Sequence, residues 1–388
     1  MTNLDSLWAR LSYCLAGILL VIAGCGGGSP GTGGTGVTAS SSYPIQSYGS
    51  ITGFGSIIVN GVRFDDSTAV IHVDGNTGNN WKLGLGMPVS VTGRSTTTVP
   101  TEAIAATIDT WSIAQGTVTA TSTASITVAG MTITTNPTTV YSGTASTTPI
   151  AVGDAIKVWG ISNNANYSSW LATRIESATA SSKLTSSGVV HVLAGKATLN
   201  GFELTSTSAP LLDRQVVTAY GSTTASATSV TVATLHVLDT PPMIAEGTRV
   251  EREGVITSVG PGTRFRIGST EVDASNAVFS PVGSSPALGV RAEAKGSWNG
   301  SVLVAQRVEL KSQAQLQQVE LIGNISNFIS TADFVVRGLR CDASQLKFVE
   351  NGKLSDLKDT VRVHLSGINQ GNFIKVTELE IVTSTTNP

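Results

Sequence analysis

Charged and aromatic residues are scarce in this chain of 388 residues, at 13% and 5% of the total. With a net charge of -2, the chain has no positive excess that would attract nucleic acid or an anionic membrane surface. Single-stranded nucleic acid would also require stacking aromatic rings along a basic groove. We therefore expect no nucleic-acid partner. The abundant residues are instead Thr, Ser, Gly, Ala and Val, which favour strands and turns over helices.

Cysteine and histidine are also rare, with three cysteines and four histidines in the chain. Two of the cysteines belong to the N-terminal leader, and Cys341 is expected to point into a hydrophobic interior as an inert thiol. The histidines are dispersed and form none of the spacings typical of zinc sites or catalytic triads. They are His72, His191, His236 and His364.

The best local cluster of polar side chains is the segment DDSTAVIHVDG, residues 65–75. His72 and Asp74 are two residues apart, so they would share one face of a strand and could hold a cation weakly. Solvated strand residues explain the same pattern equally well. We predict no metal ligand, no cofactor-binding residue and no catalytic residue, and the chain is expected not to be an enzyme.

The N-terminal segment carries the clearest signal of location. Residues 11–23, LSYCLAGILLVIA, form an apolar run of thirteen that follows Arg10. This run is shorter than the roughly 20 residues of a transmembrane helix and has the length of a signal-peptide core. The next segment, VIAGC, ends at Cys25. It resembles the lipobox of bacterial lipoproteins, in which an aliphatic residue and small residues precede an invariant cysteine.

This resemblance implies that a diacylglycerol is attached to Cys25, that the leader is cut before it, and that the new amino group is acylated. Several acyl chains together give firm anchoring, whereas one chain binds only marginally. Gly26 stands where inner-membrane lipoproteins have Asp, so the outer membrane is the expected destination, with the protein on its periplasmic face or at the cell surface. An ordinary secretory signal with an incidental cysteine is the alternative.

Residues 26–46, GGGSPGTGGTGVTASSSYPIQ, contain no charged residue. Such a Gly/Ser/Thr segment cannot bury enough surface to offset its ordering entropy. We therefore predict a signal peptide over residues 1–24, followed over residues 25–46 by a lipidated Cys25 and a flexible tether.

After the tether, one pattern occurs five times. A Gly-x-apolar start recurs at spacings of 67, 72, 66 and 69 residues, at Gly49, Gly116, Gly188, Gly254 and Gly323. Each start is followed by a two-residue turn candidate of the type that closes a β-hairpin. These turns are Asn60-Gly61, Ala129-Gly130, Asn200-Gly201, Gly268-Ser269 and Arg337-Gly338.

The hairpin interpretation makes a specific demand, because residues equidistant from a two-residue turn pair directly and share one face. Two such pairs flank each turn, and of the twenty positions nineteen are apolar. The predicted pairs are Val59/Val62, Ile57/Phe64, Val128/Met131, Ile126/Ile133, Leu199/Phe202, Ala197/Leu204, Ile267/Thr270, Phe265/Val272, Val336/Leu339 and Phe334/Cys341.

Each unit then shows an alternating strand that ends in Gly, as in GMPVSVTG at residues 86–93, and a further strand after it. About five strands in each unit predict an all-β protein, a tandem array of five small OB-like Greek-key barrels or half-open sandwiches. The third unit is shorter, so it is expected to have lost a loop or a strand. The expected repeats span residues 47–110, 111–181, 182–240, 241–312 and 313–388.

The units resemble a bacterial domain-of-unknown-function family whose modules repeat in secreted lipoproteins. The segment GSITGFGSIIVNGVRFD, residues 49–65, carries the resemblance most strongly, and the third and fifth units carry it faintly. The family implies no biochemical role for individual residues. A unit of this size buries little surface alone, so neighbouring units should support each other. We expect two rigid blocks with a seam near Thr240.

These observations favour a membrane-anchored lipoprotein that acts as a non-enzymatic cell-envelope scaffold, adhesion or binding protein. Its expected partners are the membrane, through the lipid anchor, and a cell-envelope polysaccharide or protein. One alternative is a carbohydrate- or polymer-binding module, and another is a hydrolase with a site dispersed over several units. The candidate sugar-stacking residues, for which packing in the core or at its rim is the favoured explanation, are Trp81, Trp159, Tyr167, Trp170 and Trp298.

Overall fold

The computed structural model describes residues 42–207, 210–223, 228–238 and 243–382. The predicted signal peptide, Cys25 and residues 26–41 of the predicted tether lie outside this part. The described residues belong to one compact unit, and the first strand starts at Tyr43, inside the segment expected to be tether. Ile45 explains this start, because its side chain is buried and the backbone around it pairs with two other strands.

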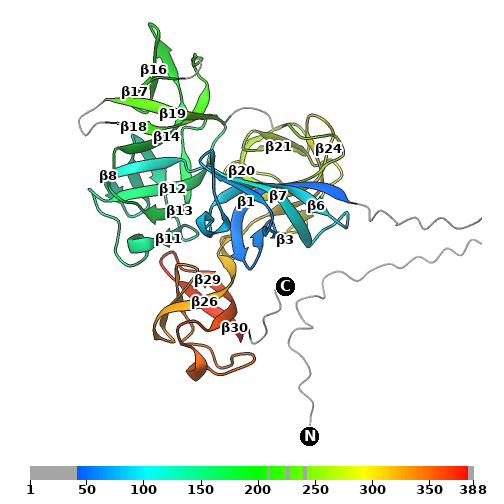
Figure 1. Cartoon of the computed structure of the whole chain (residues 1–388). Coiled ribbons are helices and arrows are strands. Elements are labelled where there is room, and N and C mark those ends of the chain that lie inside the picture. The colour runs from blue at the N-terminus through cyan, green and yellow to red at the C-terminus, as the bar shows by residue number, and fades with distance from the viewer. Residues whose placement is uncertain (1–41, 208–209, 224–227, 239–242, 383–388) are drawn as a thin grey trace, which may run out of the picture. The chain divides into compact units, whose positions relative to one another are not determined.

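The first repeat closes a small barrel (Figure 1). Its strands are β1 (Tyr43–Phe54), β2 (Ile57–Val59), β3 (Val62–Asp65), β6 (Pro88–Ser95) and β7 (Glu102–Thr110). Strands β1, β2 and β3 form an antiparallel meander, β3 runs parallel to β7, and β7 pairs with β6, which returns to β1. This closed order is that of an OB-type Greek-key barrel, as the sequence predicted.

The other four repeats have the same order of strands. The second contains β8 (Ala114–Ser122), β9 (Ser125–Val128), β10 (Met131–Thr134), β12 (Ala155–Ser162) and β13 (Trp170–Ser177). The third contains β14 (Lys183–Val189), β15 (His191–Leu193), β16 (Lys196–Leu199), β17 (Phe202–Thr205), β18 (Val216–Ser222) and β19 (Ser229–Val237).

The fourth repeat contains β20 (Arg249–Val259), β21 (Arg264–Ile267), β22 (Thr270–Asp273), β24 (Arg291–Trp298) and β25 (Leu303–Leu310). The fifth contains β26 (Gln318–Ser330), β27 (Asp333–Val336), β28 (Leu339–Asp342), β29 (Arg362–Asn369) and β30 (Ile374–Ile381). In the third repeat β14 and β15 together correspond to the first strand, because β14 pairs with β18 and β15 with β16. Counted this way, the third strand is parallel to the last one in every repeat.

Short elements complete the barrels. A short strand runs parallel to the last strand in three repeats, namely β4 (Val70–Val73), β11 (Val140–Ser142) and β23 (Val278–Ser280). No such strand is assigned between β17 and β18 in the described part of the third repeat, which accounts for its shorter sequence. The remaining elements are β5 (Asn76–Thr77), η2 (Asn80–Lys82), η3 (Gly143–Ser146), α1 (Gln313–Leu316) and η4 (Leu354–Asp356).

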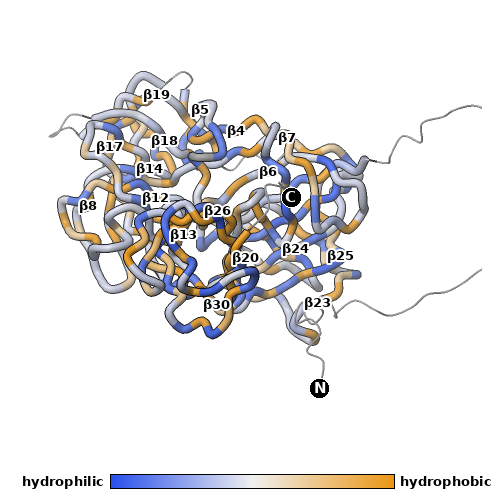
Figure 2. The backbone as a smooth tube through the Cα atoms, turned by 60° about the horizontal axis from the view of Figure 1, so that its bottom comes forward, coloured by the Kyte–Doolittle hydropathy of each residue, from blue (hydrophilic) through white to orange (hydrophobic). Residues whose placement is uncertain are grey.

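The hairpins have the register that the sequence predicts. Nine of the ten predicted pairs are direct partners, and Ala197/Leu204 is the one pair not formed as a strand partner. At the first tip both Asn60 and Gly61 have positive φ, 55° and 74°, as a tight hairpin turn requires. Hydrophobic and hydrophilic residues alternate along the strands (Figure 2), so each hairpin turns one face to a core.

One strand prediction needs correction. The fourth strand of each barrel does not end at its glycine but continues beyond it, and the register shifts at that point. At these bulges the last strand of the barrel crosses so closely that a Cβ atom would lie 1.9 to 2.5 Å from its nearest neighbouring atom. The glycines are Gly93, Gly160, Gly221, Gly296 and Gly367. They permit the close approach rather than terminate a strand.

Two sheets connect the barrels in an order that the sequence did not suggest. Strand β1 runs parallel to β20 of the fourth repeat and to β26 of the fifth, whereas the second and third repeats pair through β8 and β14. The expected division into the first three and the last two repeats is therefore wrong in one respect, because the first repeat is paired with the fourth and fifth. Thr240 itself lies outside the described residues.

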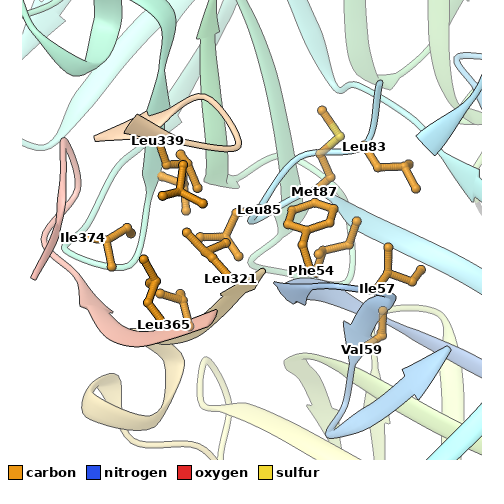
Figure 3. Packing of buried hydrophobic residues seen from close by; sticks show 14 of the residues in the cluster. Phe54, Ile57, Val59, Leu83, Leu85, Met87, Leu321, Leu339, Leu365 and Ile374 are labelled. Atoms are coloured by element: carbon orange, nitrogen blue, oxygen red, sulfur yellow. The ribbon is translucent and has the colours of Figure 1, made fainter. Parts of the chain in front are cut away.

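Buried hydrophobic residues follow this grouping. One cluster combines the first and fifth repeats, a second combines the second and third, and a third belongs to the fourth. Figure 3 shows the first cluster, in which Phe54 and Met87 of the first repeat lie with Leu321 and Leu365 of the fifth. Trp159 of the second repeat also packs into this cluster. Neighbouring repeats therefore share hydrophobic cores.

Buried charges lie where the fourth repeat meets the first. The carboxylates of Glu251 and Glu253 are paired with Arg249 at 3.2 Å and Arg291 at 2.8 Å, and Arg291 also donates to the Ser50 hydroxyl at 2.9 Å. Burial raises the pKa of Glu251 above its ordinary value, and its cationic neighbours oppose that shift. Removing one partner from such a buried pair is strongly destabilising, so this junction tolerates little change.

Candidate binding cavity

His72 and Asp74 do not share a strand face. Strand β4 ends at Val73, and Asp74 turns away with φ 53°. His72 Nδ1 lies 2.8 Å from Asp109 Oδ1, whereas Asp74 accepts from the Ser112 amide at 2.7 Å and pairs with Lys157 of the second repeat at 2.5 Å. Asp74 thus links two repeats, and the pair of cation ligands that the sequence left open as an alternative is not formed.

The described residues contain no group of three or more His, Cys, Asp or Glu side chains that could hold a metal ion. Within this part of the chain, Asp109 is also the only side chain hydrogen-bonded to His72. The alternative of a dispersed hydrolase site thus gains a His-Asp pair, but no described hydroxyl or thiol is hydrogen-bonded to this histidine.

Cys341 lies opposite Phe334 in the fifth hairpin, as predicted, and is 1% exposed. Burial raises the pKa of its thiol to about 12, so almost none of it is thiolate near neutral pH. Because the thiolate is the nucleophile, this position carries no reactive group.

Most of the candidate sugar-stacking residues are interior. Trp159, Trp170 and Trp298 are buried, which confirms the packing explanation for these three. The Trp81 side chain lies outside the described part. Tyr167 is only partly buried, and it lines a cavity.

This cavity has a volume of about 260 Å³ and is bounded by residues of four repeats. Tyr48 comes from β1, Trp170 from β13, His236 from β19 and Arg252 from β20, while Trp111 stands between β7 and β8. The parallel pairing of β1 with β20 makes Tyr48 and Arg252 direct partners. Barrel packing alone therefore brings aromatic and charged side chains together at this point.

Arg252 is the chemically distinctive residue of the cavity. Its guanidinium carbon lies 3.9 Å from the centre of the Tyr48 ring, a close cation–π contact. Its Nε atom is sealed from solvent and has no hydrogen-bond partner among the described residues, and no described carboxylate pairs with it. Burial lowers the pKa of Arg252, opposed by Tyr48 and Tyr167. Arg249 and Arg291, in contrast, both have carboxylate partners.

His236 forms a second polar group of the wall. Its ring stacks on Trp111 at 4.1 Å and 22°, and its Nδ1 atom is buried without a hydrogen-bond partner in the described part. Burial lowers the pKa of His236, although Asp109 and Asp74 act in the opposite direction. The imidazole is therefore neutral near pH 7 and adds a hydrogen-bonding atom but no charge.

The carboxylates of the wall are already occupied. Asp109 is hydrogen-bonded to His72, and Glu253 is paired with Arg291. Arg252 is consequently the one charged side chain of the cavity wall that has neither a hydrogen-bond nor an ion-pair partner among the described residues. The residue is half-buried, and a charge that is partly removed from water without a partner is costly, so the cavity is electrostatically suited to an anion.

A wider polar groove of about 830 Å³ borders the cavity. It runs between the second and third repeats and shares two wall residues with the cavity, Tyr167 and Trp170. These two rings lie 5.9 Å apart, and Trp170 Nε1 donates to the Tyr167 carbonyl at 3.2 Å. Hydrogen-bonding side chains line the rest of the groove, among them Asn166, His191 and Arg214.

Of the residues that line this cavity, sequence reasoning proposed only Tyr167 and Trp170 for contact with a ligand. Arg252 lies in the alternating segment RVEREG, where charged residues resemble an ordinary solvated strand. Tyr48 lies two residues before the buried Ser50, in a strand that pairs on both sides. No local pattern could have connected positions 204 residues apart.

Comparison with known families gives two matches. A family model described as "Domain of unknown function (DUF5666)" matches residues 115–176 and 253–309. These segments fall in the second and fourth repeats, so the family likeness is recognised there and not in the first repeat, where it was expected to be strongest. No curated protein matches the chain. Among the described residues, no helix is both long and apolar enough to cross a membrane.

Proposed function

We propose that the chain is a lipid-anchored, non-enzymatic protein of the bacterial cell envelope that acts as a rigid scaffold. The lipobox-like segment VIAGC supports anchoring through Cys25 to the outer membrane. One structural observation carries the scaffold role: the parallel pairing of β1 with both β20 and β26. This pairing joins the first repeat to the fourth and fifth repeats. Five repeats that were independent of one another would have no such pairing.

The anchor is tested by metabolic labelling with radioactive palmitate in a bacterial host. We expect the full chain to incorporate the label and to sediment with outer membranes, and Cys25→Ala to lose both properties. Cys14→Ala is the matched control, because it removes the other leader cysteine and should leave labelling unchanged. Equal labelling of Cys25→Ala and the unmodified chain would refute the proposed anchor.

Ligand binding is a second candidate function, supported by the cavity around Arg252. The aromatic walls, the unpaired guanidinium and the adjoining polar groove fit the general form of a small-molecule or polymer site. In this role the protein would hold a cell-envelope polymer near the membrane. Retention of the detergent-purified full chain on immobilised envelope polysaccharide tests this role, and no retention on any such polymer would exclude it.

A further inference from the structure

We propose that the cavity binds the carboxylate-bearing sugar of an acidic polysaccharide, with the carboxylate on Arg252 and the sugar ring against the aromatic walls. This inference rests on the second candidate function and names its ligand class. The wall residues that carry it are Tyr48, Trp111, Tyr167, Trp170, His236 and Arg252.

The charge of the wall selects a monoanion. Arg252 contributes one positive charge, His236 is neutral because burial lowers its pKa, and the nearby carboxylates of Asp109 and Glu253 have partners of their own. A second negative charge on the ligand would find no further cation and would face these carboxylates. A single carboxylate therefore fits better than inorganic phosphate or a phosphate monoester, which carries more than one charge near neutral pH.

The geometry of Arg252 favours a planar acceptor. The guanidinium carbon lies 3.9 Å from the centre of the Tyr48 ring, and the N–H groups of a guanidinium all lie in its own plane. A carboxylate matches this fork with two parallel hydrogen bonds, which are stronger than neutral ones. The buried Nε, which lacks a partner in the described part of the chain, would gain one in this arrangement.

The size of the cavity and its aromatic walls indicate a sugar ring. Its volume of about 260 Å³ lies just below the range of pockets for drug-sized ligands, so one ring fits and a chain of rings does not. The C–H faces of a pyranose pack against the negative faces of aromatic rings such as Trp111 and Tyr167. Further sugars would extend over the polar groove that shares Tyr167 and Trp170.

Calorimetric titration of the detergent-purified full chain tests the proposal. The probes are oligomers of galacturonate, glucuronate and mannuronate, the fully methyl-esterified form of each, and inorganic phosphate. The ester keeps the ring and removes the charge. We expect at least one uronate oligomer to bind at least about tenfold more tightly than its ester and than phosphate, with affinity that falls as salt is added.

Two substitutions locate the site. Arg252→Gln is expected to weaken uronate binding at least about tenfold, and Arg252→Lys, which keeps the charge but loses the fork, to give an intermediate loss. Arg266→Gln in the same repeat is the matched control, because Arg266 is exposed, pairs at the surface with Glu271 and otherwise donates to the Ser269 carbonyl at 3.3 Å. Thermal unfolding of each variant shows whether it is folded.

The outcomes separate the inference from the function on which it rests. Uronates and esters that bind equally well, or phosphate that binds as well as the best uronate, would overturn the acidic-sugar site while leaving polymer binding in place. If Arg252→Gln left uronate binding unchanged, the binding site would not be in this cavity. If no probe bound at concentrations up to about 10 mM and the protein were retained on no polymer, both the acidic-sugar site and the polymer-binding function would be refuted. The ester comparison needs no variant and therefore holds even if Arg252→Gln fails to fold.

Discussion

The residue at the first position of a hairpin tip holds the hairpin to the first strand in three repeats. Asn60 donates to the carbonyl of Tyr48 at 3.0 Å, and Asn200 donates to the carbonyl of Ser187 at 2.9 Å. Arg337 donates from Nε to the carbonyl of Ile322 at 3.2 Å. Each acceptor immediately precedes the glycine that marks the start of its repeat. The glycine leaves room for the reaching side chain, since a Cβ at Gly49 would lie 2.4 Å from Asn60 Oδ1.

Asn60 therefore serves the turn in two ways, through its positive φ and through its buried hydrogen bonds. We predict that Asn60→Gly lowers the free energy of unfolding by about 1 to 2 kcal/mol. Glycine tolerates the φ of 55°, so the loss reports the bonds to Tyr48 and to the Ser47 hydroxyl at 2.9 Å. The measurement is urea unfolding followed by tryptophan fluorescence.

Asn351→Gly is the matched control for this change. Asn351 has a similar φ of 59°, but it is exposed, and in the described part of the chain its side chain bonds only to the half-buried Glu380. Its substitution should change the stability by less than about 0.5 kcal/mol. Equal effects of the two substitutions would show that the backbone angle, and not the buried bonds, makes asparagine valuable at the tip.

At the scale of elements, the bulged fourth strand is the feature common to all five barrels. Its glycine lets the last strand cross at a distance that no side chain allows, and at Gly296 a Cβ would lie 1.9 Å from the Val304 carbonyl oxygen. A carbonyl belongs to the backbone and cannot rotate away. The pairing of the fourth strand with the last strand of each barrel therefore depends on this one residue type.

We predict that Gly296→Ala destabilises the protein by about 2 to 3 kcal/mol, because the added methyl group forces the two strands of the fourth repeat apart. Differential scanning calorimetry of the full chain provides the measurement. Gly260→Ala is the control in the same repeat, since a Cβ there meets nothing closer than 3.5 Å and its φ is not positive. A Gly296→Ala variant as stable as Gly260→Ala would contradict this account of the bulge.

The same elements show what could be predicted from the sequence. The hairpins were predictable in register because a two-residue turn fixes its flanking pairs locally, as for Ile57 with Phe64. The bulge glycines were visible but were interpreted as strand ends, because the clash that requires them comes from the last strand of the barrel. At position 296, for example, the Val304 carbonyl leaves no room for any residue other than glycine. The strand pattern in the sequence does not show that Val304 is the neighbour of this position.

At the scale of the whole molecule, the repeats are joined by contacts that have no sequence periodicity. Lys157 reaches Asp74 of the first repeat, and Asn369 of the fifth donates to the Thr138 carbonyl of the second at 3.1 Å. Each contact occurs once, so a repeat pattern cannot reveal it. The candidate cavity has the same origin, because the pairing of β1 with β20 is what brings Arg252 to Tyr48. A candidate site at such a junction cannot be found from the sequence, because it depends on how the repeats are arranged in space.

The junction of the first and fifth repeats contains a titratable link. Glu320 lies 2.5 Å from Arg63 of the first repeat and 2.9 Å from His364 Nε2, and Glu380 lies 3.6 Å from His364 Nδ1. The hydrogen bond to Glu320 raises the pKa of His364, while burial and Arg63 oppose the shift. The same hydrogen bond lowers the pKa of Glu320, against the effect of burial.

These shifts define a pH window for the link. The contribution of His364 is fully present below its unfolded pKa of about 6.5 and is lost as the pH rises through the higher folded value. The contribution of Glu320 is present above its unfolded pKa of about 4.3 and is lost as the pH falls through the lower folded value. Both are present together between roughly pH 4.5 and 6.5.

We predict that His364→Gln lowers the melting temperature more at pH 5.5 than at pH 8.5, because glutamine cannot acquire the charge that attracts Glu320. The measurement is the difference in melting temperature between the unmodified chain and the variant at each pH, so that the titration of every other group cancels. His191→Gln is the control, since His191 is exposed, and its difference should be the same at both values. If the His364→Gln difference were equally large at pH 8.5, the histidine would contribute by packing, and the charge on His364 would not be what ties the fifth repeat to the first.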